Sequence, residues 1–118
     1  MKIAIVKYNA GNVESVKNAL NRLGVEPVLT DTAEELQTSD KVIFPGVGEA
    51  ASAMRYLREK GLDTVIKNLR QPVLGVCLGM QLLGEFSEEN CTTCLGIVPF
   101  RVKKFSKIRS PTAPDFSV

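Results

Sequence analysis

Short apolar runs alternate with segments of helical periodicity along the chain, and this alternation constrains the possible fold most strongly. The apolar runs lie at residues 2–8, 26–30, 41–44 and 72–76, and each is short and β-rich enough to be a buried strand. A repeated strand–helix order predicts a parallel sheet, because each crossover lays a helix over one of its faces. We therefore expect an α/β fold with an open, mostly parallel sheet and helices on both faces.

The helical segments carry apolar stripes at the spacing of one helix face. The clearest lies in residues 48–61, where four apolar residues recur at i, i+3, i+4 and i+7: Ala50, Ala53, Met54 and Leu57. Two more stripes consist of Val13, Val16, Leu20 and Leu23, and of Leu62, Val65, Ile66 and Leu69. Asn12 is a suitable N-cap for the first of these helices, and Gly24 and Gly61 are expected stops. Another helix is predicted to begin within residues 78–86.

The pattern changes after about residue 90. Residues 95–105 predict one or two further strands, whereas residues 106–118 contain serines and prolines without any period and predict a frayed or disordered tail. Residues 1–105 thus read as the N-terminal part of a domain that is truncated at its C-terminus, since doubly wound sheets ordinarily continue with more strands. An uncovered strand edge would favour self-association.

Composition excludes several classes of protein. A net charge of +2 gives no broad basic surface for nucleic acid, and no apolar run approaches the roughly 20 residues of a membrane span. The chain contains three cysteines, an odd number, and we expect neither a signal peptide nor a disulfide scaffold. These features predict a cytoplasmic protein, because a reducing compartment keeps thiols free.

Residues 75–79, Gly-Val-Cys-Leu-Gly, have the form of a nucleophile elbow between a strand and a helix. Gly75 and Gly79 would leave room for a tight bend that exposes Cys77. The start of the helix would favour its thiolate, and the Leu78 N–H would point at the oxyanion formed when the sulfur attacks a carbonyl. The alternative is a buried structural cysteine in a capping turn. The two flanking glycines favour the nucleophile.

Residues 44–50, FPGVGEA, form a second glycine-bearing turn after a strand. Gly46, Gly48 and Ala51 satisfy G-x-G-x-x-A, a pattern that can bind a dinucleotide. This turn follows the third strand instead of the first, Pro45 stiffens it, and the next strand does not end in an acidic residue that could bind a ribose. We therefore expect no nucleotide and no other cofactor, and the glycines can simply serve a tight turn.

Two further patterns have simpler explanations. Cys91 and Cys94 form a C-x-x-C, but the chain has no second such pair and no histidine to complete a zinc site, and the motif does not open a predicted helix. We predict no metal site. The basic residues between 101 and 109, with Phe105 among them, are typical of a solvated strand edge and lack the stacking aromatics of a nucleic-acid surface.

Three separated motifs together resemble one family. KYNAGNVESVKNAL (7–20), FPGVGEAASAM (44–54) and PVLGVCLGMQLL (72–83) occur in the order and spacing of class I, triad-type glutamine amidotransferases. Within that family the resemblance is strongest to the glutaminase subunits of imidazole glycerol phosphate synthases, which act in histidine biosynthesis. It covers residues 1–105. It implies a flavodoxin-like open sheet.

The resemblance also implies roles for individual residues. Cys77 would attack the side-chain amide of L-glutamine and release ammonia. Three residues would form the oxyanion strand, and Gln81 would help to hold the substrate; the strand residues are Gly46, Val47 and Gly48. Asn12 would face the partner subunit, a (β/α)₈ cyclase that receives the ammonia without release into bulk solvent.

The chain departs from the family in one respect, because it contains no histidine. The family's catalytic His and Glu lie on a segment that follows the strands expected at residues 95–105. Since general acid–base catalysis contributes roughly 10²–10⁴-fold, we expect this chain alone to be nearly inactive. Two alternatives stay open: a non-catalytic fragment that docks on the cyclase, and a glutaminase of another pathway, such as pyridoxal phosphate synthesis.

Overall fold

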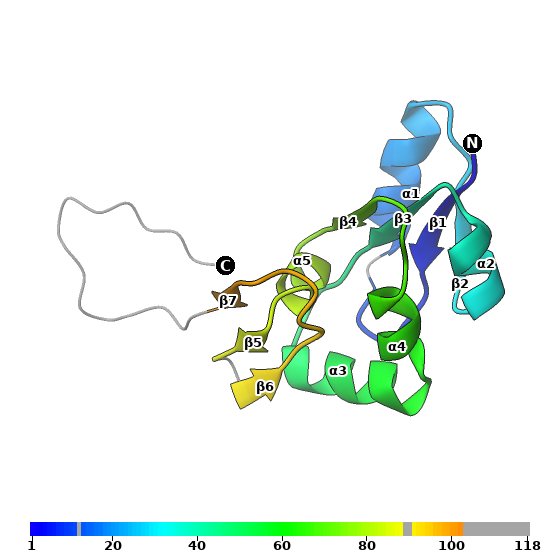
Figure 1. Ribbon diagram of the computed structural model, residues 1–118. Coiled ribbons are helices and arrows are strands. Elements are labelled where there is room, and N and C mark those ends of the chain that lie inside the picture. Colours follow the sequence, from blue (N-terminus) through cyan, green and yellow to red (C-terminus); the bar gives the residue numbers. More distant parts are fainter. Residues whose placement is uncertain (12, 89–90, 103–118) are drawn as a thin grey trace, which may run out of the picture.

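The computed structural model describes residues 1–11, 13–88 and 91–102. Four parallel strands form its main sheet, in the order β2-β1-β3-β4 (Figure 1). The strands are β1 (Ile3–Val6), β2 (Val28–Thr30), β3 (Lys41–Phe44) and β4 (Val73–Gly75). Each lies within one of the four predicted runs, so the predicted parallel sheet is confirmed. Ile5 pairs with Leu29 on one side and with Ile43 on the other.

Helices cover both faces of this sheet (Figure 1). They are α1 (Val13–Arg22), α2 (Ala33–Thr38), α3 (Ala50–Glu59), α4 (Leu62–Lys67) and α5 (Leu78–Leu82). Successive side chains of a strand point to opposite faces, so Ala4 and Val6 join the core that contains α2 to α5, while Ile3 and Ile5 pack with residues of α1. The expected two-faced arrangement is therefore present.

Apolar periodicity predicted burial correctly for one helix stripe and only in part for another. All four members of the α3 stripe are buried, and they are Ala50, Ala53, Met54 and Leu57. In the α1 stripe, by contrast, the prediction for Leu23 is wrong, since this side chain is 77% exposed. Helix α1 ends at Arg22, and Gly24 adopts a φ of +80°, so the chain leaves the helical path before Leu23 can reach the sheet.

Helix α2 was not predicted from the sequence, although its start carries the Thr-x-x-Glu pattern of a capping box. The Thr32 hydroxyl accepts a hydrogen bond from the Glu35 N–H at 3.4 Å, and the Glu35 carboxylate accepts one from the Thr30 hydroxyl at 3.0 Å. Threonine followed three residues later by glutamate marks a helix N-terminus. The helix buries Leu36 against the larger core.

A second, small sheet contains one strand of the one or two expected in residues 95–105, at Arg101–Val102. Its strands are β5 (Phe86–Ser87), β6 (Thr92–Thr93) and β7 (Arg101–Val102), in the order β6-β5-β7. Residues 95–98 form no strand, because their N–H groups bond instead to the end of α5: Leu95 to the Leu82 carbonyl at 2.9 Å, and Ile97 to the Leu83 carbonyl at 3.0 Å. The helix expected within residues 78–86 correspondingly ends at Leu82.

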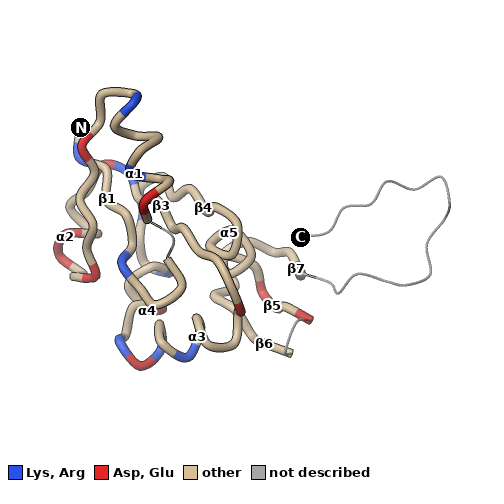
Figure 2. Tube along the Cα trace, turned by 180° about the vertical axis from the view of Figure 1, so that it is seen from behind, with Lys and Arg blue, Asp and Glu red and all other residues tan. Residues whose placement is uncertain are grey.

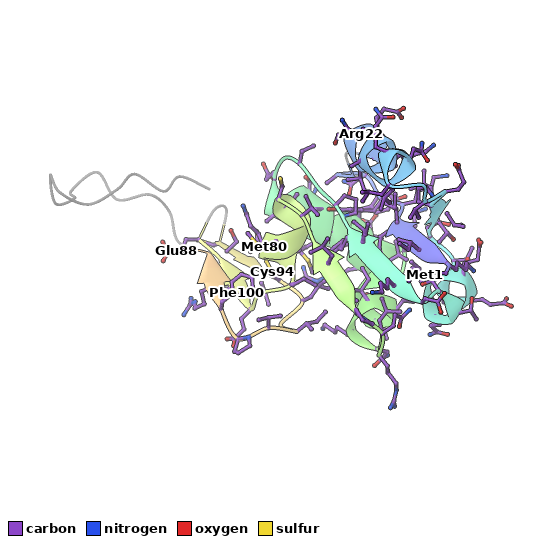
Figure 3. The ribbon with its side chains drawn as sticks, turned by 90° about the horizontal axis from the view of Figure 1, so that it is seen from above. Met1, Arg22, Met80, Glu88, Cys94 and Phe100 are labelled. Carbon is purple, nitrogen blue, oxygen red and sulfur yellow. The ribbon has the colours of Figure 1, made fainter. Side chains whose placement is uncertain are left out.

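The small sheet lies at the α5 end of the molecule. In Figure 3, Glu88, Cys94 and Phe100 gather at this end, whereas Met1 and Arg22 lie at the other. The Phe100 ring packs closely against the backbone of Gly84, just after α5, because a Cβ atom on Gly84 would lie 2.6 Å from that ring. The predicted domain boundary at residue 105 and the predicted tail lie outside the described residues.

Charged residues are distributed over several elements of the described part of the chain (Figure 2). Helix α2 carries acidic residues in its first turn and no basic residue in its last turn. Arg101 lies on β7, with its guanidinium 4.8 Å from the centre of the Phe86 ring. Among the described helices, none combines the length and the apolar character that crossing a membrane requires.

Candidate active site

Three turns meet at the carboxyl edge of the main sheet, where open α/β sheets bind their ligands. We call them the Tyr8 turn (residues 7–11), the Gly46 loop (residues 45–49) and the Cys77 turn (residues 75–79); they follow β1, follow β3, and span the end of β4 together with the start of α5. Backbone hydrogen bonds connect them in sequence. The Val47 N–H donates to the Ala10 carbonyl at 2.7 Å, and the Leu78 N–H donates to the Gly46 carbonyl at 3.1 Å.

Cys77 occupies an unusual backbone conformation at the junction of β4 and α5. Its φ is 53° and its ψ is −120°, in the left-handed half of conformational space that a non-glycine residue rarely adopts. Its side chain is exposed, while the following residues, Leu78 and Gly79, are buried. A cysteine held outward on a strained strand-to-helix bend has the geometry that an enzymatic nucleophile needs.

The two flanking glycines are required by close backbone contacts. A Cβ atom on Gly79 would overlap the Phe44 carbonyl oxygen and lie 2.6 Å from its carbon. A Cβ on Gly75 would lie 2.7 Å from the Cα of Met80, which α5 places directly above the end of β4. Both small positions of the predicted G-x-C-x-G pattern therefore have a steric reason, since real Cβ atoms do not approach other atoms so closely.

The Gly46 loop presents a carbonyl group, and not an N–H group, to the Cys77 turn. The Gly46 carbonyl accepts the hydrogen bond of the Leu78 N–H, and the N–H of the same peptide unit, that of Val47, points away to the Ala10 carbonyl. The Leu78 N–H that the sequence suggested for an oxyanion is thus engaged in this structure, and so is the Val47 N–H of the suggested oxyanion strand. The next residue, Gly48, has a φ of +104°, which glycine adopts without strain.

Tyr8 is a residue of this region that was not predicted from the sequence. Its side chain is 7% exposed, its O–H donates to the Pro45 carbonyl at 2.5 Å, and its ring centre lies 5.2 Å from that of Phe44. Burial raises the pKa of Tyr8, so its hydroxyl stays protonated and available as a donor. Its place at the end of a buried strand was the available signal, because a buried tyrosine O–H usually finds a partner.

The remaining predicted residues occupy different places. Gln81 lies one turn into α5 with its side chain 8% exposed, and its N–H donates to the Cys77 carbonyl at 3.2 Å. Asn12 lies outside the described residues. Cys91 is exposed and Cys94 is buried; burial raises the pKa of the Cys94 thiol, partly offset by the charge of Arg58. Within the described ranges, no three His, Cys, Asp or Glu side chains are grouped so that they could hold a metal ion.

Comparison with known proteins identifies similar chains. Residues 4–111 match the family model described as glutamine amidotransferase class-I. The chain is 60% identical over 106 residues to the imidazole glycerol phosphate synthase subunit HisH of Bacteroides fragilis, a match that covers 90% of this chain and 54% of that protein. It is 47% identical over 104 residues to the subunit of the same name from Idiomarina loihiensis, covering 88% of this chain and 53% of the relative.

The chain thus spans about half the length of the curated relatives it matches. A solved structure titled "Crystal structure of glutamine amidotransferase" has the same fold, with a TM-score of 0.73 and 23% sequence identity over 87% of this chain and 56% of that one. The family model covers most of the chain, including the Gly46 loop and the Cys77 turn. The chain therefore belongs to the class-I glutamine amidotransferase family.

Proposed function

We propose that this chain carries the nucleophile and the oxyanion-binding backbone of a glutaminase, which hydrolyses L-glutamine to glutamate and ammonia. The geometry of Cys77 supports this proposal most directly. The cysteine is exposed on a positive-φ bend at the start of a helix, and the flanking glycines are sterically required. This is the arrangement of a nucleophile elbow, and a purely structural cysteine needs none of it.

The reaction would begin when the Cys77 sulfur attacks the carbonyl carbon of the glutamine side-chain amide. A C–S bond forms, and the amide oxygen becomes an oxyanion. When the C–N bond breaks, the nitrogen takes the proton that the Cys77 thiol has given up, by way of solvent, and leaves as ammonia. Water then hydrolyses the thioester to glutamate and free thiol. The oxyanion needs preorganised N–H donors, for which Leu78 and the loop of Gly46, Val47 and Gly48 are the candidates.

These N–H groups could reach an oxyanion at Cys77 only after one local rearrangement of the backbone. The Gly46 carbonyl and the Val47 N–H belong to one peptide unit, bonded to the Leu78 N–H and to the Ala10 carbonyl respectively. A rotation of this peptide would release the Leu78 N–H and turn the Val47 N–H toward Cys77. Such a rotation changes ψ of Gly46 and φ of Val47, and glycine tolerates a wider range of ψ than any other residue.

The proposed setting is a heterodimer with a (β/α)₈ cyclase that makes imidazole glycerol phosphate in histidine biosynthesis. The names of the similar proteins support this pathway over pyridoxal phosphate synthesis. In this proposal Gln81 helps to hold the substrate, Asn12 faces the cyclase, and the ammonia passes directly into it. The complete synthase would combine glutaminase with lyase activity. The three free cysteines are consistent with a cytoplasmic location.

Labelling of Cys77 by a glutamine-mimicking affinity reagent tests the proposed site. The reagent should modify Cys77 in the folded chain, whereas iodoacetamide should modify both Cys77 and the exposed Cys91 and spare the buried Cys94. Excess L-glutamine should protect Cys77 from both reagents and leave the labelling of Cys91 by iodoacetamide unchanged. If Cys77 resists both reagents until the chain unfolds, it is a core cysteine and the proposed function is wrong.

A second function, non-catalytic docking on the cyclase, is favoured by one observation, since the chain has no histidine to act as a base. Glutamine turnover in the presence of cyclase and its ligand separates the two. Without a base, the chain should turn over glutamine roughly 10²–10⁴-fold more slowly than a complete triad enzyme. Cys77→Ser should abolish what remains. Binding to the cyclase without labelling by the glutamine mimic would support the docking function instead.

A further inference from the structure

The Tyr8 turn holds the Gly46 loop at two neighbouring peptide units. The Tyr8 phenol donates to the Pro45 carbonyl at 2.5 Å, and the Ala10 carbonyl accepts from the Val47 N–H at 2.7 Å. The first contact holds the Pro45–Gly46 peptide through a side chain. The second holds the Gly46–Val47 peptide through the backbone, and only this second bond must break if that peptide rotates.

The phenol is itself held rigidly. Its ring packs on Phe44, the last residue of β3, with ring centres 5.2 Å apart and ring planes inclined by 43°. The Tyr8 Oη occupies the space that a side chain on residue 46 would need. A Cβ atom on Gly46 would overlap this oxygen and would also lie 3.0 Å from the Gly79 nitrogen. The glycine of the loop and the tyrosine of the first turn are therefore sterically matched.

These contacts give the loop a fixed end and a movable end. With the Pro45 carbonyl anchored, a rearrangement of the loop is confined to rotation about ψ of Gly46 and φ of Val47. Without the phenol, the Pro45–Gly46 peptide could also turn, and the Val47 N–H would no longer arrive at a defined position beside Leu78. The Tyr8 hydroxyl would thus restrict such a motion to one peptide unit.

We propose that Tyr8 is a positioning residue of this site, whose phenol anchors the Pro45 carbonyl as the fixed end about which the Gly46–Val47 peptide turns. Its catalytic consequence rests on the proposed glutaminase function. The anchor itself does not, because it is a property of the folded chain that can be measured without substrate.

Residue-resolved amide hydrogen exchange of the whole chain tests the anchor in a Tyr8→Phe variant, which removes only the hydroxyl. The Val47 and Leu78 amides should exchange roughly 2- to 10-fold faster, the change expected for the loss of one hydrogen bond. The Val42 amide, which donates to the Pro72 carbonyl in the sheet, should be unaffected. Tyr56→Phe, which alters the other tyrosine of the chain, is the matched control and should leave all three amides unchanged.

Two exchange results would overturn the proposal. Unchanged rates at Val47 and Leu78 in Tyr8→Phe would show that the phenol does not restrain the loop. A parallel increase at Val42 would show that the hydroxyl contributes only to global stability. The proposed function is tested separately: if the glutamine mimic fails to label Cys77 in the unaltered chain, that function is disproved while the exchange pattern still decides the role of Tyr8.

A double-mutant cycle provides a second readout. Gly46→Ala should lower the melting temperature, because its Cβ would overlap the Tyr8 Oη. The same substitution in the Tyr8→Phe background should lower it less, since the overlapping atom has been removed. Additive losses in the double variant would contradict the steric match between the two residues, because residues in direct contact are expected to couple.

Discussion

At the scale of single residues, hydrogen bonds of the two neighbouring N–H groups keep Cys77 in its strained backbone conformation. Its positive φ costs on the order of 1–3 kcal/mol for a non-glycine residue. The preceding N–H, that of Val76, donates to the Phe44 carbonyl at 3.0 Å, and the following N–H, that of Leu78, donates to the Gly46 carbonyl at 3.1 Å. Both acceptors belong to the end of β3 and its loop, so packing of β3 against β4 and α5 imposes the bend.

The close approach at Gly79 leads to a first prediction. Gly79→Ala should destabilise the chain by roughly 3 kcal/mol, because the new Cβ would overlap the Phe44 carbonyl and strand and helix would have to separate. Gly24→Ala is the control: its added Cβ meets no atom within 4 Å, and its φ of +80° should cost about 1 kcal/mol. Chemical denaturation measures both, and equal losses would contradict the predicted contact.

Ser87 leads to a second prediction. Among the residues that the structure describes, its Oγ is the buried side-chain oxygen without a hydrogen-bond partner. Ser87→Ala should therefore stabilise the chain by about 1 kcal/mol, because an unsatisfied buried hydroxyl is lost. Ser39→Ala should instead destabilise it, since the Ser39 hydroxyl donates to the Leu36 carbonyl at 2.7 Å. A lower melting temperature for Ser87→Ala would show that the hydroxyl has a partner in solution.

At the scale of elements, the short helices depend on their ends and on packing. α2 has six residues and α5 has five, well below the length at which an isolated helix is stable in water. α5 is held because its first residue, Leu78, bonds to the Gly46 loop. At its other end, the carbonyls of Leu82 and of the cap residue Leu83 accept the N–H groups of Leu95 and Ile97. α2 depends instead on the cap at Thr32 and on the burial of Leu36.

The cap of α2 leads to a third prediction. Thr32→Ala should reduce the free energy of unfolding by about 1 kcal/mol, because the Glu35 N–H loses its acceptor and the Glu35 carboxylate loses a donor. Thr64→Ala, at an exposed position within α4, is the control and should change stability by less than about 0.5 kcal/mol. Equal effects in urea denaturation would mean that the cap does not stabilise α2.

At the scale of the whole molecule, the main sheet leaves an apolar surface exposed at its β4 edge. β4 is an edge strand whose Leu74 is 60% exposed. Beside it are two apolar hollows of about 290 and 410 Å³, between α1 and the β3–β4 face, that share Leu20, Ile43 and Leu74. Exposed strand edges with apolar surface favour association between chains.

This edge leads to a fourth prediction. The chain should associate in a concentration-dependent manner, and Leu74→Lys should weaken the association by placing a charge on the apolar surface. Leu29→Lys, on the opposite edge strand β2 where the side chain is 40% exposed, should have a smaller effect. Sedimentation velocity over a range of concentrations measures this. A well-behaved monomer at high concentration would contradict the prediction.

Much of the fold was predictable because its signals are local. Each of these signals lies within a few residues: the four β-rich runs, the α3 stripe and the glycines around Cys77. Periodicity and the lack of a side chain are properties of a short segment. The signal for α2 is equally local, but it is one Thr-x-x-Glu capping pattern and not an apolar stripe. β5 and β6 have two residues each, too few for any period.

The sequence by itself determined the parallel sheet, the position of the strand-to-helix bend and the identity of the cysteine at that bend. Only the tertiary structure decided how the site is arranged around that cysteine. The bond between Tyr8 and Pro45 joins residues 37 positions apart, and the Gly46 carbonyl meets an N–H from another strand's turn. Such contacts have no signature in either segment alone, because they exist only once parallel strands bring their carboxyl ends to the same edge of the sheet.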